Sequence, residues 1–429
     1  MWWLLLACGD EPGDGPVDGS PSDTASTTSV TPTPTPTETS TPPTTTDLLG
    51  GALWTESILL AAAPGGSVYG LAVAPRPEAV AVAFDMSEPD GSHWVYLGVG
   101  DPTAARPIGV AMAVLTPEVS HNPAMTADGD GWVLLLKNDA SPAQRAAVEI
   151  ALDGTVGPLE TLRPESTAVG GRADVVWNPL QATLRACWTE QSAQDQIWCA
   201  SRTEAGWGTP TPIVGAPADR DHSALAVDAV GRRLVTYRER AGALWALPVL
   251  IDDVEVARID DEPDIPDAAA LAGGGFTVVG ERRGRVFHVS CADPTACDWV
   301  GETVGDGEHP QVVALPAGGT AIAMDRPDGV WVAANCGAGW RWSLAAPGAN
   351  LGVRLVAGAP TIAVDPTNDA LIVGFVRDDI AANVAGWSRA NLGRLCVEGD
   401  SPADTGIDTG SATGRDTGAR PPADTGARP

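Results

Sequence analysis

Residues 222–249 read HSALAVDAVGRRLVTYRERAGALWALPV, and this stretch contains the pattern that decides the fold. An apolar run ends at Asp228, a turn carries Gly231, and alternating apolar and polar residues follow. A second turn contains Gly242, and a short segment with Trp245 closes the unit. Runs with a period of two, bounded by Gly, Asp and Pro, predict antiparallel strands joined by tight turns.

The same pattern recurs along residues 51–399. Similar units begin at Gly70, His121, Ala173, Ala268, His309 and Ala359, roughly 40 to 50 residues apart. Each unit has room for a fourth strand, so the spacing is typical of a four-stranded propeller blade. The sequence therefore predicts an all-β fold, a β-propeller of about seven four-stranded blades, with six or eight as alternatives. A β-sandwich, or a pair of them, is the competing fold, but a sandwich needs no repeat at this period.

The segment before the first unit predicts how the ring closes. Residues 54–64, WTESILLAAAP, match the fourth-strand pattern but precede the first complete unit. We expect this N-terminal strand to complete the last blade, because closure removes edge strands that would otherwise pair with other chains.

The repeat resembles the blades of bacterial exported propellers, some sialidase-like domains among them, across residues 51–399. This resemblance implies a fold and names no activity.

The two ends of the chain lack the repeat. Residues 9–50 are rich in Thr and Pro, and residues 400–429 repeat Asp-Thr-Gly. Neither segment has enough large apolar residues to offset the entropy of ordering, so both are expected to be disordered. Asp-Thr-Gly also occurs in aspartic proteases, but that chemistry needs two buried carboxylates held between apolar strands, which this tail cannot supply.

Residues 1–8 form a short signal-like segment. Leu5-Leu6-Ala7-Cys8 resembles the lipobox of bacterial lipoproteins, although the basic start is missing and the apolar run is short, as it would be if the true start lay upstream. The resemblance implies lipidation of Cys8 and a place in the cell envelope, as an outer-membrane or cell-surface lipoprotein, with secretion as the alternative. The membrane would then be contacted through the lipid anchor only.

Six cysteines remain if Cys8 is lipidated, an even number that suits an oxidising compartment. Local spacing suggests three disulfides, between Cys187 and Cys199, Cys291 and Cys297, and Cys336 and Cys396, the last by elimination. Six cysteines permit about fifteen connectivities, so these pairs stay one option among several. Zinc is disfavoured because no Cys-x-x-Cys occurs.

Net charge excludes one class of partner. The chain has 55 acidic and 26 basic residues, a net charge of −29. Such a protein repels phosphate backbones, so we expect no nucleic-acid partner.

Three histidines, His121, His222 and His309, begin the first strand of alternate units. First strands line the channel of a propeller, so these side chains are candidate contacts at the channel mouth, with hydrogen bonding to an adjacent blade as the alternative. We expect them to be too far apart to bind one metal ion, because Zn–N bonds are only about 2.0–2.1 Å long.

No catalytic residue emerges from the remaining motifs. Tyr237, Arg238, Glu239 and Arg240 include residue types used by sialidases, but neighbours on a strand point to opposite faces. The loop with Asp128 and Asp130 lacks the later ligands of a calcium site, so a solvated turn is expected. No cofactor motif is present.

The sequence thus predicts a monomeric, surface-displayed, non-catalytic binding scaffold for an extracellular protein or glycan. The alternative is a divergent propeller hydrolase or lyase that acts on extracellular glycans. Three or more Arg, Asp, Glu or His side chains that meet in one pocket with shifted pKa values would favour the enzyme, whereas a mouth lined by Ala, Gly and Val would favour the scaffold.

Overall fold

The computed structural model describes residues 53–61, 66–87, 89, 93–100, 112–113, 120–138, 144–163, 169–191, 194–213, 218–337, 339–349, 361–365, 367, 369–378 and 383–398. Cys8, the Thr/Pro-rich segment 9–50 and the tail 400–429 lie outside the described residues, and what the sequence predicts of them stays a prediction.

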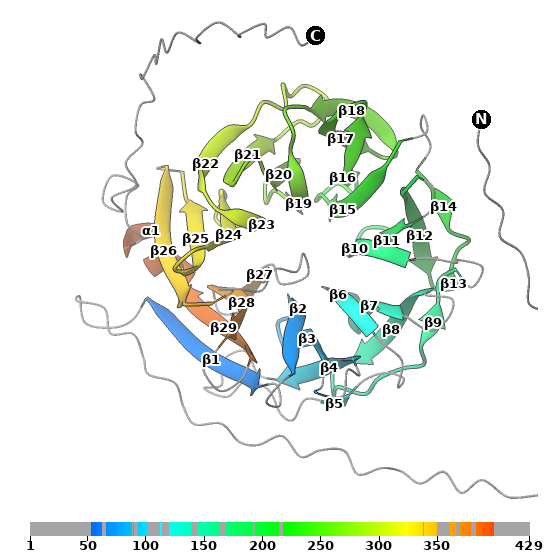
Figure 1. The fold of residues 1–429 in the computed structure, drawn as a ribbon, viewed down its shortest axis with the longest axis vertical. Coiled ribbons are helices and arrows are strands. Elements are labelled where there is room, and N and C mark those ends of the chain that lie inside the picture. Colours follow the sequence, from blue (N-terminus) through cyan, green and yellow to red (C-terminus); the bar gives the residue numbers. More distant parts are fainter. Residues whose placement is uncertain are drawn as a thin grey trace, which may run out of the picture. The chain divides into compact units, whose positions relative to one another are not determined.

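The described residues form seven antiparallel sheets, the blades of a β-propeller (Figure 1). Blade 1 consists of β2 (Ser67–Pro75), β3 (Val80–Ser87), β4 (His93–Gly100) and β5 (Met112–Ala113). Blade 2 consists of β6 (Ser120–Ala127), β7 (Gly131–Asn138), β8 (Gln144–Ala151) and β9 (Glu160–Thr161). Blade 3 consists of β10 (Val169–Asn178), β11 (Thr183–Glu190), β12 (Gln196–Thr203), β13 (Gly206–Trp207) and β14 (Thr211–Pro212).

Blades 4 to 7 follow in chain order. Blade 4 consists of β15 (Arg220–Val227), β16 (Arg233–Ala241), β17 (Leu244–Ile251) and β18 (Val254–Ile259), and blade 5 of β19 (Asp264–Ala270), β20 (Phe276–Glu281), β21 (Arg285–Cys291) and β22 (Glu302–Asp306). Blade 6 consists of β23 (Glu308–Ala314), β24 (Thr320–Arg326), β25 (Gly329–Asn335) and β26 (Trp340–Pro347). Blade 7 consists of β27 (Thr361–Asp365), β28 (Ala370–Asp378), β29 (Asn383–Asn391) and β1 (Trp54–Ala61). The predicted fold and the seven blades are confirmed.

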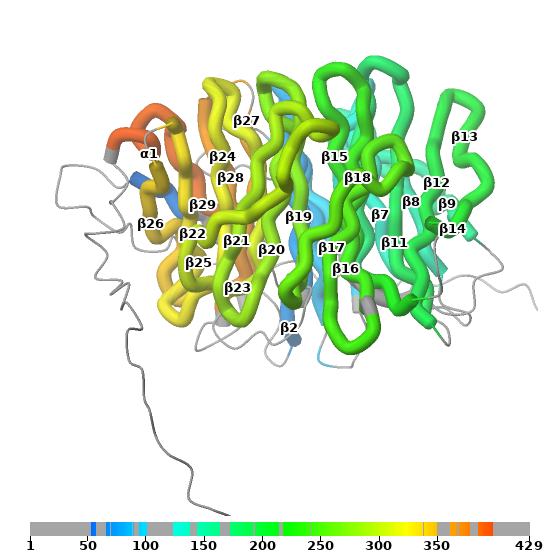
Figure 2. Tube along the Cα trace, turned by 90° about the horizontal axis from the view of Figure 1, so that it is seen from above, coloured from blue at the N-terminus to red at the C-terminus, as the bar shows by residue number. Residues whose placement is uncertain are grey.

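The first strand of each blade lies innermost, and each contacts the first strands of its neighbours (Figure 1). Seen from the side, the blades stand next to one another around the ring (Figure 2). Because every first strand runs in the same sense, their N-terminal ends gather at one end of the channel, which we call the channel mouth.

The last blade contains both ends of the repeat. β1 pairs with β29, from Trp54 opposite Ala390 to Ala61 opposite Val384. Trp54 also donates a hydrogen bond from Nε1 to Ser343 Oγ in blade 6, at 3.0 Å. The predicted closure of the ring by the N-terminal strand is therefore confirmed.

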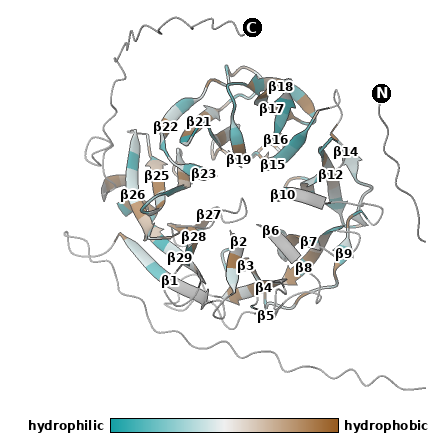
Figure 3. Ribbon diagram, viewed as in Figure 1, coloured by the Kyte–Doolittle hydropathy of each residue, from teal (hydrophilic) through white to brown (hydrophobic). Residues whose placement is uncertain are grey.

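The core lies between the blades. All eight residues of β3 are buried, because neighbouring blades cover both of its faces. Between blades 1 and 2, Trp132 and Leu134 pack against Ala81 and Ala83, and Trp132 Nε1 donates to the carbonyl of Ala74 at 2.8 Å. Full burial of a side chain such as Leu134 stabilises the fold by roughly 2–3 kcal/mol. At the rim, β22 is mostly hydrophilic, and no residue of it is fully buried (Figure 3).

Glycine is required where the hairpin between the first two strands approaches the third. A Cβ on Gly319 would lie 1.9 Å from the carbonyl oxygen of Asn335, and one on Gly275 would lie 2.1 Å from that of Cys291. Both residues also have positive φ, of 90° and 81°. The Gly-containing turns of the repeat therefore have a steric cause.

Three disulfides occur in the described part of the chain: Cys187–Cys199, Cys291–Cys297 and Cys336–Cys396. The first two are the pairs that local spacing suggests, and the third is the pair left by elimination. The first joins directly opposite residues of β11 and β12. The third joins Cys336, in the turn after β25 of blade 6, to the short helix α1 (Leu392–Glu398) after blade 7. Disulfides are typical of an extracellular protein. Within the described residues, no helix is long and apolar enough to cross a bilayer.

Candidate functional site at the channel mouth

A β-bulge interrupts the start of six first strands in the described part of the chain: β2, β6, β10, β15, β19 and β23. In blades 4, 5 and 6 the bulge contains His222, Ile265 and His309, with φ of 51°, 45° and 51°. A bulge bends its strand and redirects side chains. Here the bulges lie at the channel mouth, which makes this end of the ring the candidate functional site.

Two of the three predicted histidines are equivalent. His222 and His309 occupy the same bulge position in blades 4 and 6. His121 pairs with Lys137 just before its bulge, so its counterparts are Asp221 and Glu308. The prediction that all three histidines are equivalent is therefore wrong by one residue at His121, because the sequence does not show where the bulge begins. The side chain of His121 lies outside the described part.

His222 has an unusual environment. Its side chain is buried, with 8% of the residue exposed, and Nδ1 lies 3.0 Å from Asp221 Oδ1, an ion-pair distance when the ring is protonated. Among the described residues, Nε2 has no hydrogen-bond partner. A buried nitrogen without a partner is rare in folded proteins and calls for an explanation.

Asp221 belongs to an ion-pair network that joins blades 4 and 5. Arg238 donates two hydrogen bonds to Asp221, of 2.6 and 2.5 Å, and a third to Asp264 Oδ1 at 2.7 Å. The guanidinium carbon of Arg238 lies 4.2 Å from the centre of a Trp245 ring. The mouth therefore combines hydrogen-bond donors, acceptors and an aromatic ring.

Asp221 and Arg238 are both charged near neutral pH. Burial acts to raise the pKa of Asp221, but hydrogen bonds from His222 and Arg238 outweigh it and lower this pKa to about 2. Burial likewise acts to lower the pKa of Arg238, while the two carboxylates raise it above its ordinary value. These groups can exchange hydrogen bonds with a ligand without changing protonation.

A second polar cluster at the mouth joins blades 5 and 6. His309 Nδ1 lies 3.3 Å from Asp325 Oδ2, and the backbone N–H of His309 points at Glu281 Oε2, 3.5 Å away. The hydrogen bond to Asp325 raises the pKa of His309 in spite of burial. Burial raises the pKa of Glu281. His309 of blade 6 is therefore more readily protonated than an ordinary histidine, and Glu281 of blade 5 is a weaker acid than an ordinary glutamate.

A third cluster lies between the first strands. Arg172 of blade 3 reaches past blade 4 to Asp267 of blade 5, with Nη2 3.3 Å from Oδ1. Asp174 accepts a hydrogen bond from the backbone of Leu225, and Asp267 accepts one from Val312, each at 2.7 Å. The two carboxylates thus cap equivalent amides of blades 4 and 6.

One guanidinium serves two carboxylates in this third cluster. Burial, and then repulsion from Asp267, raise the pKa of Asp174 to about 7, and burial also raises that of Asp267. Arg172, Asp174 and Asp267 were not among the sequence candidates, because only the ring places blades 3 and 5 on either side of blade 4, close enough for these side chains to meet.

The other sequence candidates have structural roles in the described residues. Tyr237 is buried in the core, and burial raises its pKa to about 12. Asp128 Oδ1 accepts hydrogen bonds from the backbone of Asp130 and Gly131, which stabilises its own turn. Within the described residues, no group of three or more His, Cys, Asp or Glu side chains is arranged to hold a metal ion.

No model of a known protein family matches the chain, and no characterised protein matches it in sequence. Solved structures do match its fold. The BP39L lectin from Burkholderia pseudomallei is 13% identical with a TM-score of 0.50, over 74% of this chain and 95% of the lectin.

Two further solved structures are enzymes. The Hadza microbial sialidase Hz136 is 11% identical with a TM-score of 0.47, over 73% of this chain and 74% of the sialidase. The polysaccharide lyase Uly1 is 9% identical with a TM-score of 0.47, over 76% and 90%. At such identities the likeness shows the propeller fold alone, and propellers of this kind include both binding proteins and enzymes.

Proposed function

We propose that this chain is an extracellular binding module that recognises neutral glycans at the channel mouth, with no catalytic role for the mouth itself. The observation that carries the proposal is the buried Nε2 of His222, which has no partner among the described residues and lies beside the Asp221–Arg238–Asp264 network.

The chemistry of the mouth suits a polyhydroxylated ligand. An unsatisfied buried polar group costs about 1–3 kcal/mol, which a ligand hydroxyl bound to His222 would recover. The carboxylates of Asp221 and Asp264 accept hydrogen bonds, Arg238 donates them, and Trp245 offers an apolar ring. Few polar groups around an apolar surface are typical of small-ligand sites. The net charge of −29 disfavours anionic glycans, which is why neutral ones are proposed.

The direct test is binding to a panel of neutral, sialylated and uronate-containing oligosaccharides. We expect binding of neutral members only. His222→Asn tolerates the positive φ but cannot place a nitrogen at the position of Nε2, so affinity should fall about tenfold, the loss of one hydrogen bond. Arg233→Ala is the matched control, because Arg233 lies at the opposite end of β16 from Arg238 and therefore away from the mouth. Equal affinity of the His222→Asn variant and the wild type would refute the proposed site.

The proposal includes the cellular setting. The lipobox-like segment supports lipidation of Cys8, attachment to the cell envelope through that anchor, and display of a monomeric propeller beyond the Thr/Pro-rich segment. A protein ligand in place of a glycan would use the same face. Mass spectrometry of the mature chain from a membrane fraction should find a diacylglycerol on Cys8; an unmodified Cys8 would contradict the anchor.

A glycan hydrolase or lyase is the second candidate function, and the cluster at Glu281 and His309 favours it. A carboxyl with raised pKa beside a histidine resembles a general acid. Mass spectrometry of the same oligosaccharides after incubation decides between the two functions. Intact ligands support binding alone, whereas cleavage that is lost in Glu281→Gln supports the enzyme.

A further inference from the structure

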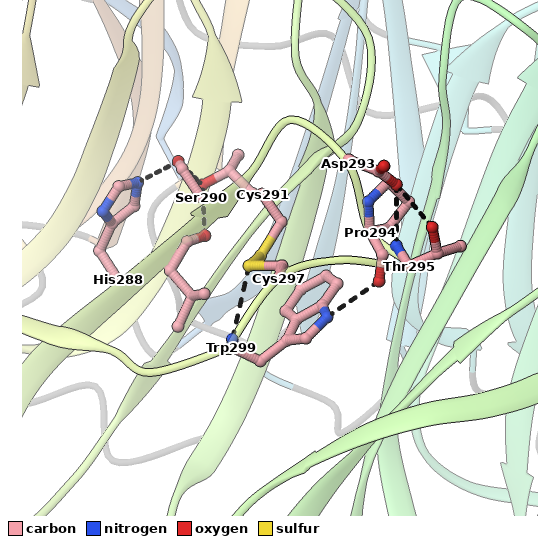
Figure 4. The surroundings of a disulfide bond; sticks show 10 residues. His288, Ser290, Cys291, Asp293, Pro294, Thr295, Cys297 and Trp299 are labelled. Carbon is pink, nitrogen blue, oxygen red and sulfur yellow. Dashed lines mark hydrogen bonds between the residues drawn. A yellow bond between two sulfur atoms is a disulfide. The ribbon is translucent and has the colours of Figure 1, made fainter.

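A separate polar cluster lies on the outer strands of blades 5 and 6. His288 and Ser290 are two residues apart on β21 and therefore share a face (Figure 4). Ser290 Oγ lies 2.9 Å from His288 Nε2, and His288 Nδ1 lies 3.3 Å from Glu302 Oε1 on β22. A hydroxyl, an imidazole and a carboxylate are thus joined in sequence, within hydrogen-bonding distance at each step.

Neighbouring residues hold the imidazole and the carboxylate in place. Trp340 donates a hydrogen bond from Nε1 to Glu302 Oε1 at 3.1 Å, and its ring meets His288 edge-on, with centres 4.9 Å apart. Thr320 Oγ1 of blade 6 lies 3.3 Å from His288 Nε2. The base is therefore oriented by groups from both blades.

Exposure differs between the base and the hydroxyl. His288 is buried, with 6% of the residue exposed, whereas Ser290 is exposed. Burial lowers the pKa of His288, although Glu302 acts to raise it. The ring is therefore mostly neutral at pH 7. We place the proton of the neutral ring on Nδ1, toward Glu302, so that the lone pair on Nε2 faces Ser290.

We propose that Ser290 is the nucleophile and His288 the general base of an ester-cleaving site, with Glu302 as the positioning residue. This combination of nucleophile, base and orienting acid is the arrangement that activates serine for acyl transfer. The ligand class is a carboxylic ester, and the site is separate from the channel mouth, so either proposal can fail without the other.

The reaction balances without a cofactor. Ser290 Oγ attacks the ester carbonyl while His288 Nε2 takes the hydroxyl proton, and the alcohol leaves with that proton, which forms an acyl ester on Ser290. Water then loses a proton to His288 and attacks the acyl group. The acid is released, and the proton returns to Ser290 Oγ. The Cys291–Cys297 disulfide fixes the strand end next to Ser290 (Figure 4).

The test is labelling of the full, disulfide-bonded chain with a fluorophosphonate, in which a bond forms between Ser290 Oγ and phosphorus while fluoride leaves. Peptide mapping should place one adduct on Ser290, and the chain should also hydrolyse p-nitrophenyl acetate. Ser290→Ala should lose both signals. Ser201→Ala, on the third strand of blade 3, is the matched control and should keep both. Thermal melting checks that each variant is folded.

The role of Glu302 needs a second measurement, because Glu302 acts through His288. The labelling rate of the wild type should rise with pH through an inflection below 6.5, where neutral His288 forms. Glu302 is exposed, so Glu302→Gln should fold normally. It should label at least tenfold more slowly, with its inflection moved to lower pH, since the carboxylate raises the pKa of His288.

Two results would overturn the proposal. One is folded wild-type protein without an adduct on Ser290. The other is labelling spread over surface Ser and Tyr residues, with no change in Ser290→Ala. Unchanged rate and inflection in Glu302→Gln would remove Glu302 from the site.

Discussion

Asp174 and Asp267 share one cation, Arg172, inside the channel, and this imbalance has consequences for stability. Each carboxylate also caps a backbone amide of the next blade, at Leu225 or Val312. The cap explains why an acidic residue is tolerated there: an amide on the channel side of a first strand has no strand to pair with. As a consequence of burial, the pKa of Asp174 is raised.

The raised pKa of Asp174 predicts how stability depends on pH. In the folded state this pKa is about 7, whereas the unfolded value is about 3.9. Between these values the native state binds a proton that the unfolded state does not. The free energy of unfolding therefore falls as pH rises from about 4 to 7, on the order of 4 kcal/mol from this residue.

Asp174→Asn should remove that dependence. Urea denaturation at pH 4.5 and pH 8 should show a smaller loss of stability in the variant than in the wild type, because Asn keeps an acceptor for Leu225 but has no proton to lose. Asp153→Asn is the control, since Asp153 is exposed and hydrogen bonds from Thr155 lower its pKa. Parallel pH curves for the wild type and Asp174→Asn would contradict the assignment.

At the scale of elements, the bulges and the disulfides have different tasks. The bulges bend the first strands at the mouth, where His222 and His309 adopt positive φ. The disulfides join a second strand to a third strand in blade 3, and elsewhere involve third strands and the segments that follow them. The blades thus combine positive φ at the channel mouth with disulfides outside their first strands.

The Cys336–Cys396 disulfide is expected to stabilise the fold more than Cys187–Cys199. It spans 60 residues and joins blade 6 to α1, whereas the other spans 12 residues within one hairpin. Loop-closure entropy gives about 4 kcal/mol for the longer loop and about 3 kcal/mol for the shorter. Calorimetry of the paired Cys→Ala variants should show the larger drop in Tm for Cys336→Ala/Cys396→Ala. The reverse order would mean that native-state geometry outweighs loop length.

At the scale of the molecule, the ring is closed by one strand that is distant in sequence. β1 covers β29, and Trp54 packs in the core between blades 6 and 7. Without β1, β29 would present a row of unpaired backbone groups, which is a template for pairing with another chain. The closure therefore contributes to stability and covers an edge that could otherwise pair with another chain.

Deletion of residues 54–61 should open the ring. We expect a marked fall in Tm and the appearance of dimers or larger species, measured by calorimetry and size-exclusion chromatography. Deletion of residues 29–36, in the segment that the sequence predicts to be disordered, is a control of equal length and should change neither. A monomeric deletion variant with an unchanged Tm would show that β1 is dispensable.

The sequence by itself determined the all-β class, the repeat and the closing strand, and it offered the seven blades and the cysteine pairs as one option among several. These follow from local periodicity, from a repeat of regular length and from short spacings, and such features need no tertiary contacts to be seen. Only the tertiary structure decided which charged groups meet. Arg172 and Asp267 are 95 residues apart in sequence, and their side chains meet past blade 4. The offset of His121 depends on a bulge that leaves no mark in the sequence, and the contact of His288 with Thr320 depends on the packing of two blades. Side-chain chemistry at such sites is set by distances of a few ångströms between strands remote in sequence, and those distances exist only once the ring has closed.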